Sequence, residues 1–115
     1  MMVTGLALFV SRVDGAEISK TEQASLVKLV AKHAKALKLS SAEGERASPR
    51  LYDYGNYEKK GLGVVLYEDA ILGEMPDDIR EDHEDAGKRG AMKVAKGIDK
   101  EQPRTYSFKA YYVEV

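Results

Sequence analysis

Apolar residues form an unbroken run near the start of the chain. Residues 3–13 include Gly5-Leu-Ala-Leu-Phe-Val10, which lacks both the alternation of a half-exposed strand and the spacing of a helix. A short continuous run of this kind is typical of a strand buried on both faces. Because Asp14-Gly15 after it is a turn signal, the pattern predicts a central strand over residues 3–13.

The next apolar positions recur at helical spacing. Ser19-Lys-Thr-Glu22 has the spacing of a capping box, in which the serine side chain accepts a hydrogen bond from the backbone of Glu22. At about 100° per residue, two opposite faces separate clearly. The apolar face holds Leu26, Leu29, Val30, His33 and Leu37, and the basic face holds Lys28, Lys32, Lys35 and Lys38. We expect a helix that begins at Ser19, with the lysines as its solvated face.

Two more strands are predicted after a polar loop at residues 40–49. Residues 50–54 form a short candidate strand, and Leu62 to Tyr67 form a second buried run. Residues 55–61, with a glycine at each end, connect them. This arrangement favours an antiparallel pair of strands.

A second helical stretch begins at Pro76, with acidic residues in its first turn and basic residues toward Lys96, as the helix dipole prefers. Gly87 and Gly90 interrupt it, each at a cost of about 1 kcal/mol relative to alanine. One long helix and two shorter helices therefore both fit. Gly97 is the expected C-cap.

The chain ends in an alternating segment at residues 104–115. Tyr106, Phe108, Ala110 and Tyr112 share one face, with mostly polar residues on the other. The order of elements is then β-α-β-β-α-β. The simplest solution is a ferredoxin-like α+β fold, a four-stranded antiparallel sheet with two helices on one face, in a single domain of residues 1–115.

Charge is balanced overall but unevenly distributed. There are 18 basic and 19 acidic residues, for a net charge of -1, which argues against a general affinity for nucleic acid or membrane surfaces. Residues 68–85 hold nine acids and one base, whereas residues 88–104 hold six bases and two acids. This asymmetry can serve a local interaction that the net charge hides.

The chain has no cysteine. This excludes disulfides, thiol catalysis and cysteine-based metal sites, and it is compatible with the cytoplasm, where we expect the protein. No apolar run is long enough to span a bilayer, and no nucleophile elbow, phosphate-binding glycine loop or His-Glu-x-x-His pattern occurs. We therefore assign no catalytic residue, metal ligand, cofactor or membrane partner.

Two segments resemble the RNA recognition motif. Leu8-Phe-Val-Ser-Arg-Val13 resembles its short first-strand motif. Lys60-Gly-Leu-Gly-Val-Val-Leu-Tyr67 resembles the longer motif, which runs basic-Gly-aromatic-Gly-aromatic-Val-x-aromatic. Leu62 and Val64 stand where that motif has its first two aromatics, on which bases stack. The resemblance implies RNA binding by the sheet as an alternative function.

A sheet with helices on one side leaves its other face open. Tyrosine supplies a large contact area and a hydrogen-bonding tip, and a contiguous apolar patch marks a surface that a partner covers. The candidate binding face consists of Phe9, Tyr52, Tyr54, Tyr57 and Tyr67. We expect a second copy of the chain, in a homodimer, or a protein or small-molecule partner to cover it.

The two histidines fall on the core-facing sides of the two helices. His33 and His83 are therefore candidate buried histidines, either as ordinary hydrogen-bonded core residues or as a ring pair that binds metal or senses pH. In the acidic stretch, Asp78, Asp82 and Asp85 share one side of a helix at metal-compatible spacing. A solvated acidic first turn is the plainer interpretation.

The sequence favours a non-enzymatic binding or interaction module of unknown specific role. The aromatic strands, the absence of catalytic motifs and the separated charge blocks support this hypothesis. Two alternatives stay open: an RNA-binding domain with degenerate recognition-motif strands, and a small enzyme that uses tyrosine, histidine and carboxylate groups.

Overall fold

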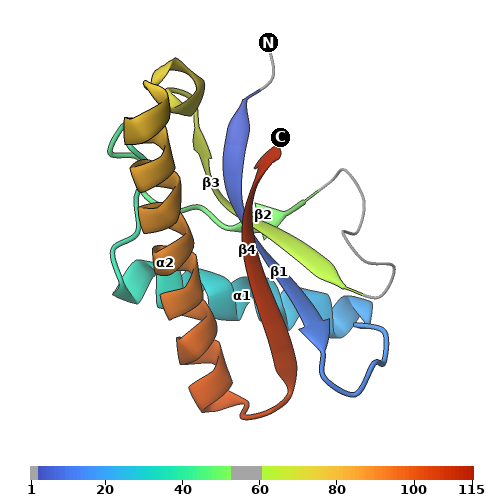
Figure 1. The fold of residues 1–115 in the computed structure, drawn as a ribbon. Coiled ribbons are helices and arrows are strands. Elements are labelled where there is room, and N and C mark those ends of the chain that lie inside the picture. Colours follow the sequence, from blue (N-terminus) through green and yellow to red (C-terminus); the bar gives the residue numbers. More distant parts are fainter. Residues whose placement is uncertain (1–2, 53–60) are drawn as a thin grey trace.

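Two helices cover one face of a four-stranded sheet in the computed structural model, which describes residues 3–52 and 61–115 (Figure 1). The elements are β1 (Thr4–Arg12), α1 (Lys20–Ala36), β2 (Arg50–Leu51), β3 (Leu62–Asp69), the 3-10 helix η1 (Leu72–Glu74), α2 (Asp77–Glu101) and β4 (Tyr106–Glu114). The strand order is β2-β3-β1-β4, and every neighbouring pair is antiparallel. The predicted ferredoxin-like arrangement is confirmed.

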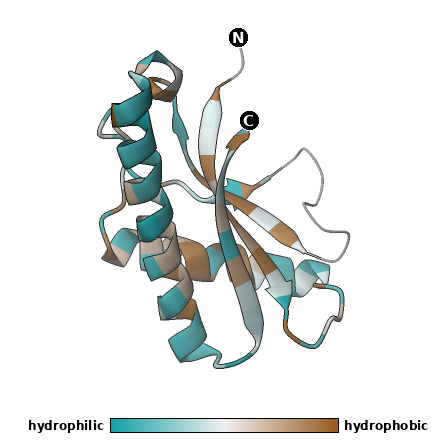
Figure 2. Ribbon diagram, in the orientation of Figure 1, coloured by the Kyte–Doolittle hydropathy of each residue, from teal (hydrophilic) through white to brown (hydrophobic). Residues whose placement is uncertain are grey.

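The main core lies between the helices and the sheet. The side chains of β1 and β3 that face the helices include Leu6, Leu8, Val10, Leu62, Val64 and Leu66. From β4, the alternating set at residues 106, 108, 110 and 112 packs into the same core, as its pattern predicts. Figure 2 shows hydrophobic positions along the strands, while α2 turns a largely hydrophilic surface outward.

α1 begins where its capping residue predicts. Ser19 is the N-cap, and its hydroxyl accepts a hydrogen bond from the Glu22 backbone N–H at 3.2 Å. Leu37 differs from the expectation, because it follows the last helical residue and is 43% exposed. The four lysines of the basic face are exposed. The buried residues of the helix are Leu26, Val30 and Ala34.

α2 is one continuous helix through Gly87 and Gly90. A Cβ atom at residue 87 would lie 2.0 Å from the hydroxyl oxygen of Tyr112, and one at residue 90 would lie 2.9 Å from Leu39 Cδ2. Glycine is used here because neighbouring side chains occupy the space of a Cβ atom. Packing thus outweighs the helix propensity that made two shorter helices a reasonable alternative.

The expectation that Gly97 caps α2 is wrong. The helix continues to Glu101, and a Cβ atom at residue 97 would lie 2.4 Å from Nδ1 of His33. Gly97 therefore lets α1 approach α2 closely. A glycine that makes room for a neighbouring helix and one that ends a helix look alike in a sequence.

Candidate functional site

The face of the sheet opposite the helices carries a smaller apolar cluster, centred on Phe9 of β1. Ala7, Phe9 and Val65 are buried there, with exposed fractions of 0, 7 and 2%. Around them lie the partly buried side chains of Tyr52, Tyr111, Val113 and Val115. The open face therefore has a core of its own, bordered by two tyrosines and two valines.

Aromatic contacts hold Phe9 in place. Its ring centroid lies 5.8 Å from that of Tyr111 in a tilted arrangement and 6.0 Å from that of Tyr52 in an edge-on arrangement, both of which are favoured geometries for ring pairs. Gly63 of β3 pairs with Phe9, and a Cβ atom there would lie 2.9 Å from the Phe9 ring. The missing side chain of Gly63 is what gives the ring space to lie over β3.

Tyr52, which follows β2, contacts residues of both β1 and β4 on the open face. Its ring contacts Phe9, and its hydroxyl donates a hydrogen bond to the Glu114 carbonyl at 3.2 Å. The ring thus shields part of the apolar centre. The open face presents tyrosine rings with hydroxyl groups rather than a broad bare apolar patch.

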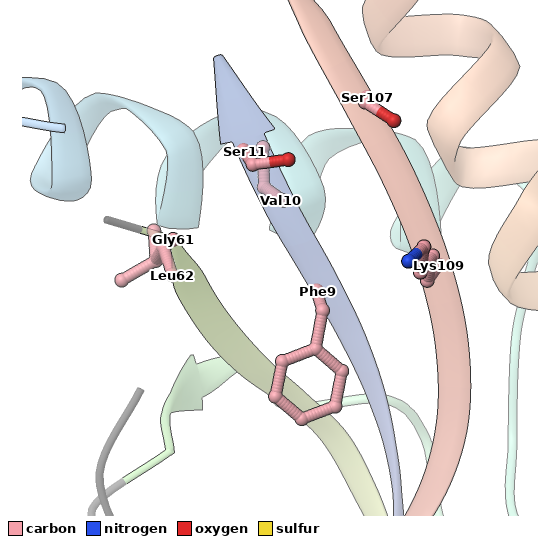
Figure 3. Close-up of a pocket in the computed structure, with 7 residues that line it drawn as sticks. All are labelled: Phe9, Val10, Ser11, Gly61, Leu62, Ser107 and Lys109. Atoms are coloured by element: carbon pink, nitrogen blue, oxygen red, sulfur yellow. The ribbon is translucent and has the colours of Figure 1, made fainter. Parts of the chain in front are cut away.

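A hollow of about 210 Å³ lies beside Phe9 on this face. Figure 3 shows its walls: Phe9 and Ser11 of β1, Leu62 of β3, and Ser107 and Lys109 of β4. The Phe9 ring, two serine hydroxyls and the Lys109 side chain thus line the same space, while the Leu62 side chain faces the helices. This combination suits an apolar group that carries a polar attachment.

Of the five residues expected on the binding face, Phe9 and Tyr52 lie there. Tyr54 and Tyr57 fall outside the described residues. The placement of Tyr67 is wrong, because its side chain packs in the main core with the helices.

A β-bulge is the reason for the position of Tyr67. The register of β1 and β3 shifts between Leu6 and Ala7, which leaves one extra residue in β3. Leu66 and Tyr67 consequently both face the helices, and the alternation of β3 is reversed beyond them. Asp69 therefore also turns toward α2, where it contacts a histidine.

That histidine is His83 of α2, and with Asp69 it belongs to a polar cluster under the N-terminal half of the helix. The Asp69 side chain is fully buried, and its Oδ2 lies 2.6 Å from His83 Nε2. Its Oδ1 and the Tyr112 hydroxyl are buried without a hydrogen-bond partner of good geometry among the described residues. Burial raises the pKa of both Tyr112 and the adjacent Tyr67, and the presence of Tyr67 raises that of Tyr112 further.

Asp69 and His83 have the geometry of an oriented acid–base pair. In a hydrolytic triad, a nucleophile is hydrogen-bonded to the other ring nitrogen of such a histidine. Over residues 3–52 and 61–115, the hydrogen bond of the His83 ring is the one to Asp69. In the described part of the chain, the cluster therefore contains an oriented histidine–carboxylate pair but no nucleophile hydrogen-bonded to the histidine.

Both histidines are partly buried rather than fully buried as the helix faces predict. The His33 and His83 side chains are 19% and 24% exposed. Glu101 of α2 lies 2.6 Å from both Lys32 Nζ and His33 Nε2, and hydrogen bonds from these two groups lower the pKa of Glu101. Since His83 and Glu101 are about 27 Å apart along α2, each histidine has a separate carboxylate and the two form no ring pair.

The acidic stretch of α2 is a solvated surface. Asp78, Asp82 and Asp85 are exposed. Among the residues that the structure describes, no group of three or more histidine, aspartate or glutamate side chains could hold a metal ion. The plainer interpretation of this stretch fits the structure.

The segments that resemble the RNA recognition motif are out of phase with the open face. Leu62 and Val64, at the positions of the first two stacking aromatics, face the helices, as does Tyr67. Phe9 lies on the open face. RNA bases stack on exposed aromatic rings. Because the motif positions that would carry those rings face the helices, the structure argues against RNA binding in the manner of that family.

Several residues of the open face were not predicted from the sequence, Tyr111 and Gly63 among them. The position of Tyr111 was predictable from the sequence, because strand alternation places it on the open face once Ala110 and Tyr112 are assigned to the core. Gly63 was not predictable in this way, because its role depends on the register that sets it beside Phe9.

No protein-family model, no curated protein and no solved structure matches this chain. Neither helix in the described part of the chain combines the length and apolar character that a membrane span needs. Function therefore rests on the geometry of the site.

Proposed function

We propose that this chain is a non-enzymatic binding module whose open sheet face receives an apolar side chain of a partner protein. The observation that carries the proposal is the hollow of about 210 Å³ beside Phe9, on the face that the helices leave uncovered. An apolar cavity of about 150 Å³ admits benzene, whereas pockets for drug-sized ligands span roughly 300–1,000 Å³. The volume supports one ring or one aliphatic group rather than a cofactor.

The surroundings of the hollow support a peptide partner. Ser11 and Ser107 lie beside Phe9, so hydroxyl groups are available to the backbone of a segment whose side chain enters. Tyr52 and Tyr111 add rigid contact area at the margin, and tyrosine is enriched in protein interfaces for this reason. The lack of cysteine supports a cytoplasmic setting for the module.

The two alternatives have narrower support. RNA binding retains Phe9 as an open-face aromatic, but the other motif positions face the core. An enzymatic role would rest on the Asp69–His83 pair. A binding module explains more features of the open face than the RNA-binding or the enzymatic alternative does.

NMR titration with N-acetyl-phenylalanine amide tests the proposal. We expect saturable shifts at the backbone amides of Phe9, Ser11 and Ser107, with a Kd of roughly 1 mM for so small a probe. N-acetyl-alanine amide should leave them unchanged. Ser107→Leu, which fills the mouth of the hollow, should weaken binding roughly tenfold, while Ser25→Leu on the exposed side of α1 is the matched control.

Equal shifts with both probes, or unchanged binding by Ser107→Leu, would contradict the proposal. Salt-dependent shifts at Phe9 with single-stranded RNA would favour the RNA alternative instead.

A further inference from the structure

A groove of about 700 Å³ lies between the C-terminal half of α1 and the segment that leads into β2. Ala31, Ala34 and Leu39 line it from α1 and the residues after the helix, and Ala47 and Pro49 line it from the segment before β2. Because the helix positions on this flank are alanines, they leave space beside α1. The volume falls within the range of roughly 300–1,000 Å³ that is typical of pockets for small organic molecules.

Backbone hydrogen bonds hold the segment before β2 in place. The Ala47 N–H donates to the Leu39 carbonyl at 3.0 Å, and the Ser48 N–H donates to the Leu66 carbonyl of β3 at 2.9 Å. The segment is thus fixed to the end of α1 on one side and to the sheet on the other. The groove is therefore formed before a ligand enters, which reduces the ordering cost of binding.

Three exposed cations also line the groove, namely Lys35, Lys38 and Arg46. Within residues 3–52 and 61–115, the lysine and arginine side chains that form ion pairs are Arg12, Lys32, Arg50 and Arg80. The positive charges around the groove therefore have no carboxylate partner in that part of the chain. Glu45, the acid next to Arg46 in the sequence, is not among the described residues that line the groove.

The three cations gather at one end of the groove. Lys35 lies in the last turn of α1, and Lys38 follows the helix. Arg46 lies beside the same end, because it pairs with Ser40 in an isolated antiparallel bridge. Ala31 lies about 6 Å before Lys35 along the helix axis. The groove thus has an apolar part and a positively charged end.

Lys38 has a backbone conformation that favours glycine. Its φ is 54°, in the left-handed region, and the Leu39 N–H that follows it donates to the Ala34 carbonyl at 3.1 Å. Helices commonly end with glycine in this conformation, because a Cβ atom is disfavoured there. The end of the helix by itself therefore gives no reason for a lysine at this position, whereas an anion in the groove does.

We propose that this groove binds a small molecule with an apolar body and an anionic head group, either a carboxylate or a phosphate ester. The apolar body lies against Ala31 and Ala34, and the head group lies among Lys35, Lys38 and Arg46. Hydrogen bonds between charged partners are roughly twice as strong as neutral ones. The planar guanidinium of Arg46 matches two oxygens of either head group.

The apolar part of the groove favours a small amphiphilic molecule over a nucleic-acid backbone. Cations alone are enough to bind a chain of phosphates, and such a chain has no apolar body to fill the space beside Ala31 and Ala34. The groove lies on the helix side of the sheet, whereas the hollow beside Phe9 lies on the open face. The two sites are therefore separate, and either proposal can fail without the other.

Calorimetric and NMR titration of the full chain with octanoate at neutral pH test the proposal. We expect a Kd of roughly 1 mM or below and saturable shifts at the backbone amides of Ala34, Lys38 and Ala47. Octanol lacks the charge, octylammonium reverses it and acetate lacks the apolar body, so each should bind at least roughly tenfold more weakly. Octyl phosphate distinguishes the two head groups, because the tighter of it and octanoate carries the preferred one.

Lys38→Gly separates a loss of binding from a loss of folding. Glycine suits a φ of 54°, so this variant should melt no lower than the unmodified chain, yet bind octanoate roughly fivefold or more weakly. Lys28→Gln removes an exposed lysine of α1 outside the groove and should leave the Kd unchanged. Ala31→Leu fills the apolar part and should weaken binding roughly tenfold, while Ala36→Leu, at an exposed position outside the groove, is its control.

Equal affinities for octanoate and octanol would overturn the proposal, because the cations would then contribute nothing. Equal affinities for octanoate and acetate would do the same, since the apolar part would have no role. Unchanged binding by Lys38→Gly, or equal effects of Ala31→Leu and Ala36→Leu, would exclude this groove as the site. Shifts confined to Phe9 and Ser107 would also exclude it, because octanoate would then occupy the hollow of the open face.

Discussion

Gly87→Ala should destabilise the protein, although the same change stabilises most helices. In a helix interior, alanine is favoured over glycine by about 1 kcal/mol. Here the new Cβ atom would lie 2.0 Å from the Tyr112 hydroxyl oxygen and 3.0 Å from its Cζ. Overpacking typically costs about 1–3 kcal/mol, and so short a contact belongs near the upper end. The expected net loss is about 2 kcal/mol, which lowers the melting temperature by roughly 8 °C.

A double-mutant cycle with Tyr112→Phe tests the cause. The Tyr112 hydroxyl is buried without a hydrogen bond of good geometry, and its polar neighbour is the Tyr67 hydroxyl, so its removal alone should cost no more than about 1 kcal/mol. In that background the closest contact of the methyl group introduced by Gly87→Ala is gone. The cost of Gly87→Ala should fall by about 2 kcal/mol, which is within the range for residues in direct contact.

Urea midpoints of the four proteins, measured at one pH, give the coupling free energy. Gly73→Ala is the control, since a Cβ atom there meets nothing within 4 Å, and it should change stability by less than about 0.5 kcal/mol. The explanation fails if Gly87→Ala raises the midpoint as helix propensity alone would. It also fails if the loss is as large with phenylalanine at position 112 as with tyrosine.

Three further predictions concern elements that hold the sheet and α1 together. Ser19→Ala removes the cap of α1 and should cost about 1 kcal/mol; an unchanged unfolding midpoint would contradict that role. Deleting residues 105–115 removes the neighbour of β1 and should leave the chain unfolded or aggregated, so a soluble product with a cooperative melt would refute it. Hydrogen bonds from Tyr106 and Arg12 lower the pKa of Glu22. The ionised Glu22 side chain therefore contributes fully to folding stability above the ordinary pKa of 4.5, and this contribution is lost as pH falls through the lowered pKa. Glu22→Gln should therefore cost about 1–2 kcal/mol at pH 7 and progressively less as pH falls below 4.5, and a pH-independent difference would exclude this mechanism.

Local patterns were sufficient for the elements and their order. The unbroken apolar run around Phe9 identified the central strand, and the Ser19–Glu22 spacing located the start of α1. Alternation at residues 106–112 assigned the core face of β4. Each of these features depends on contacts within a few residues, because capping is local and a strand side chain alternates with a period of two. The ferredoxin-like order followed from them.

Long-range contacts decided the composition of the candidate site. The bulge that turns Tyr67 and Asp69 toward α2 arises from the register between β1 and β3, and a pattern with a strict period of two cannot reveal it. The partner of His33 lies 68 residues away in the sequence. Gly87 and Gly97 resemble helix breakers, yet they are sites where another side chain occupies the space of a Cβ atom. The sequence by itself determined which segments become helices and strands, and the tertiary structure decided which side chains meet, because pairing register and close packing are set by residues far apart in the chain.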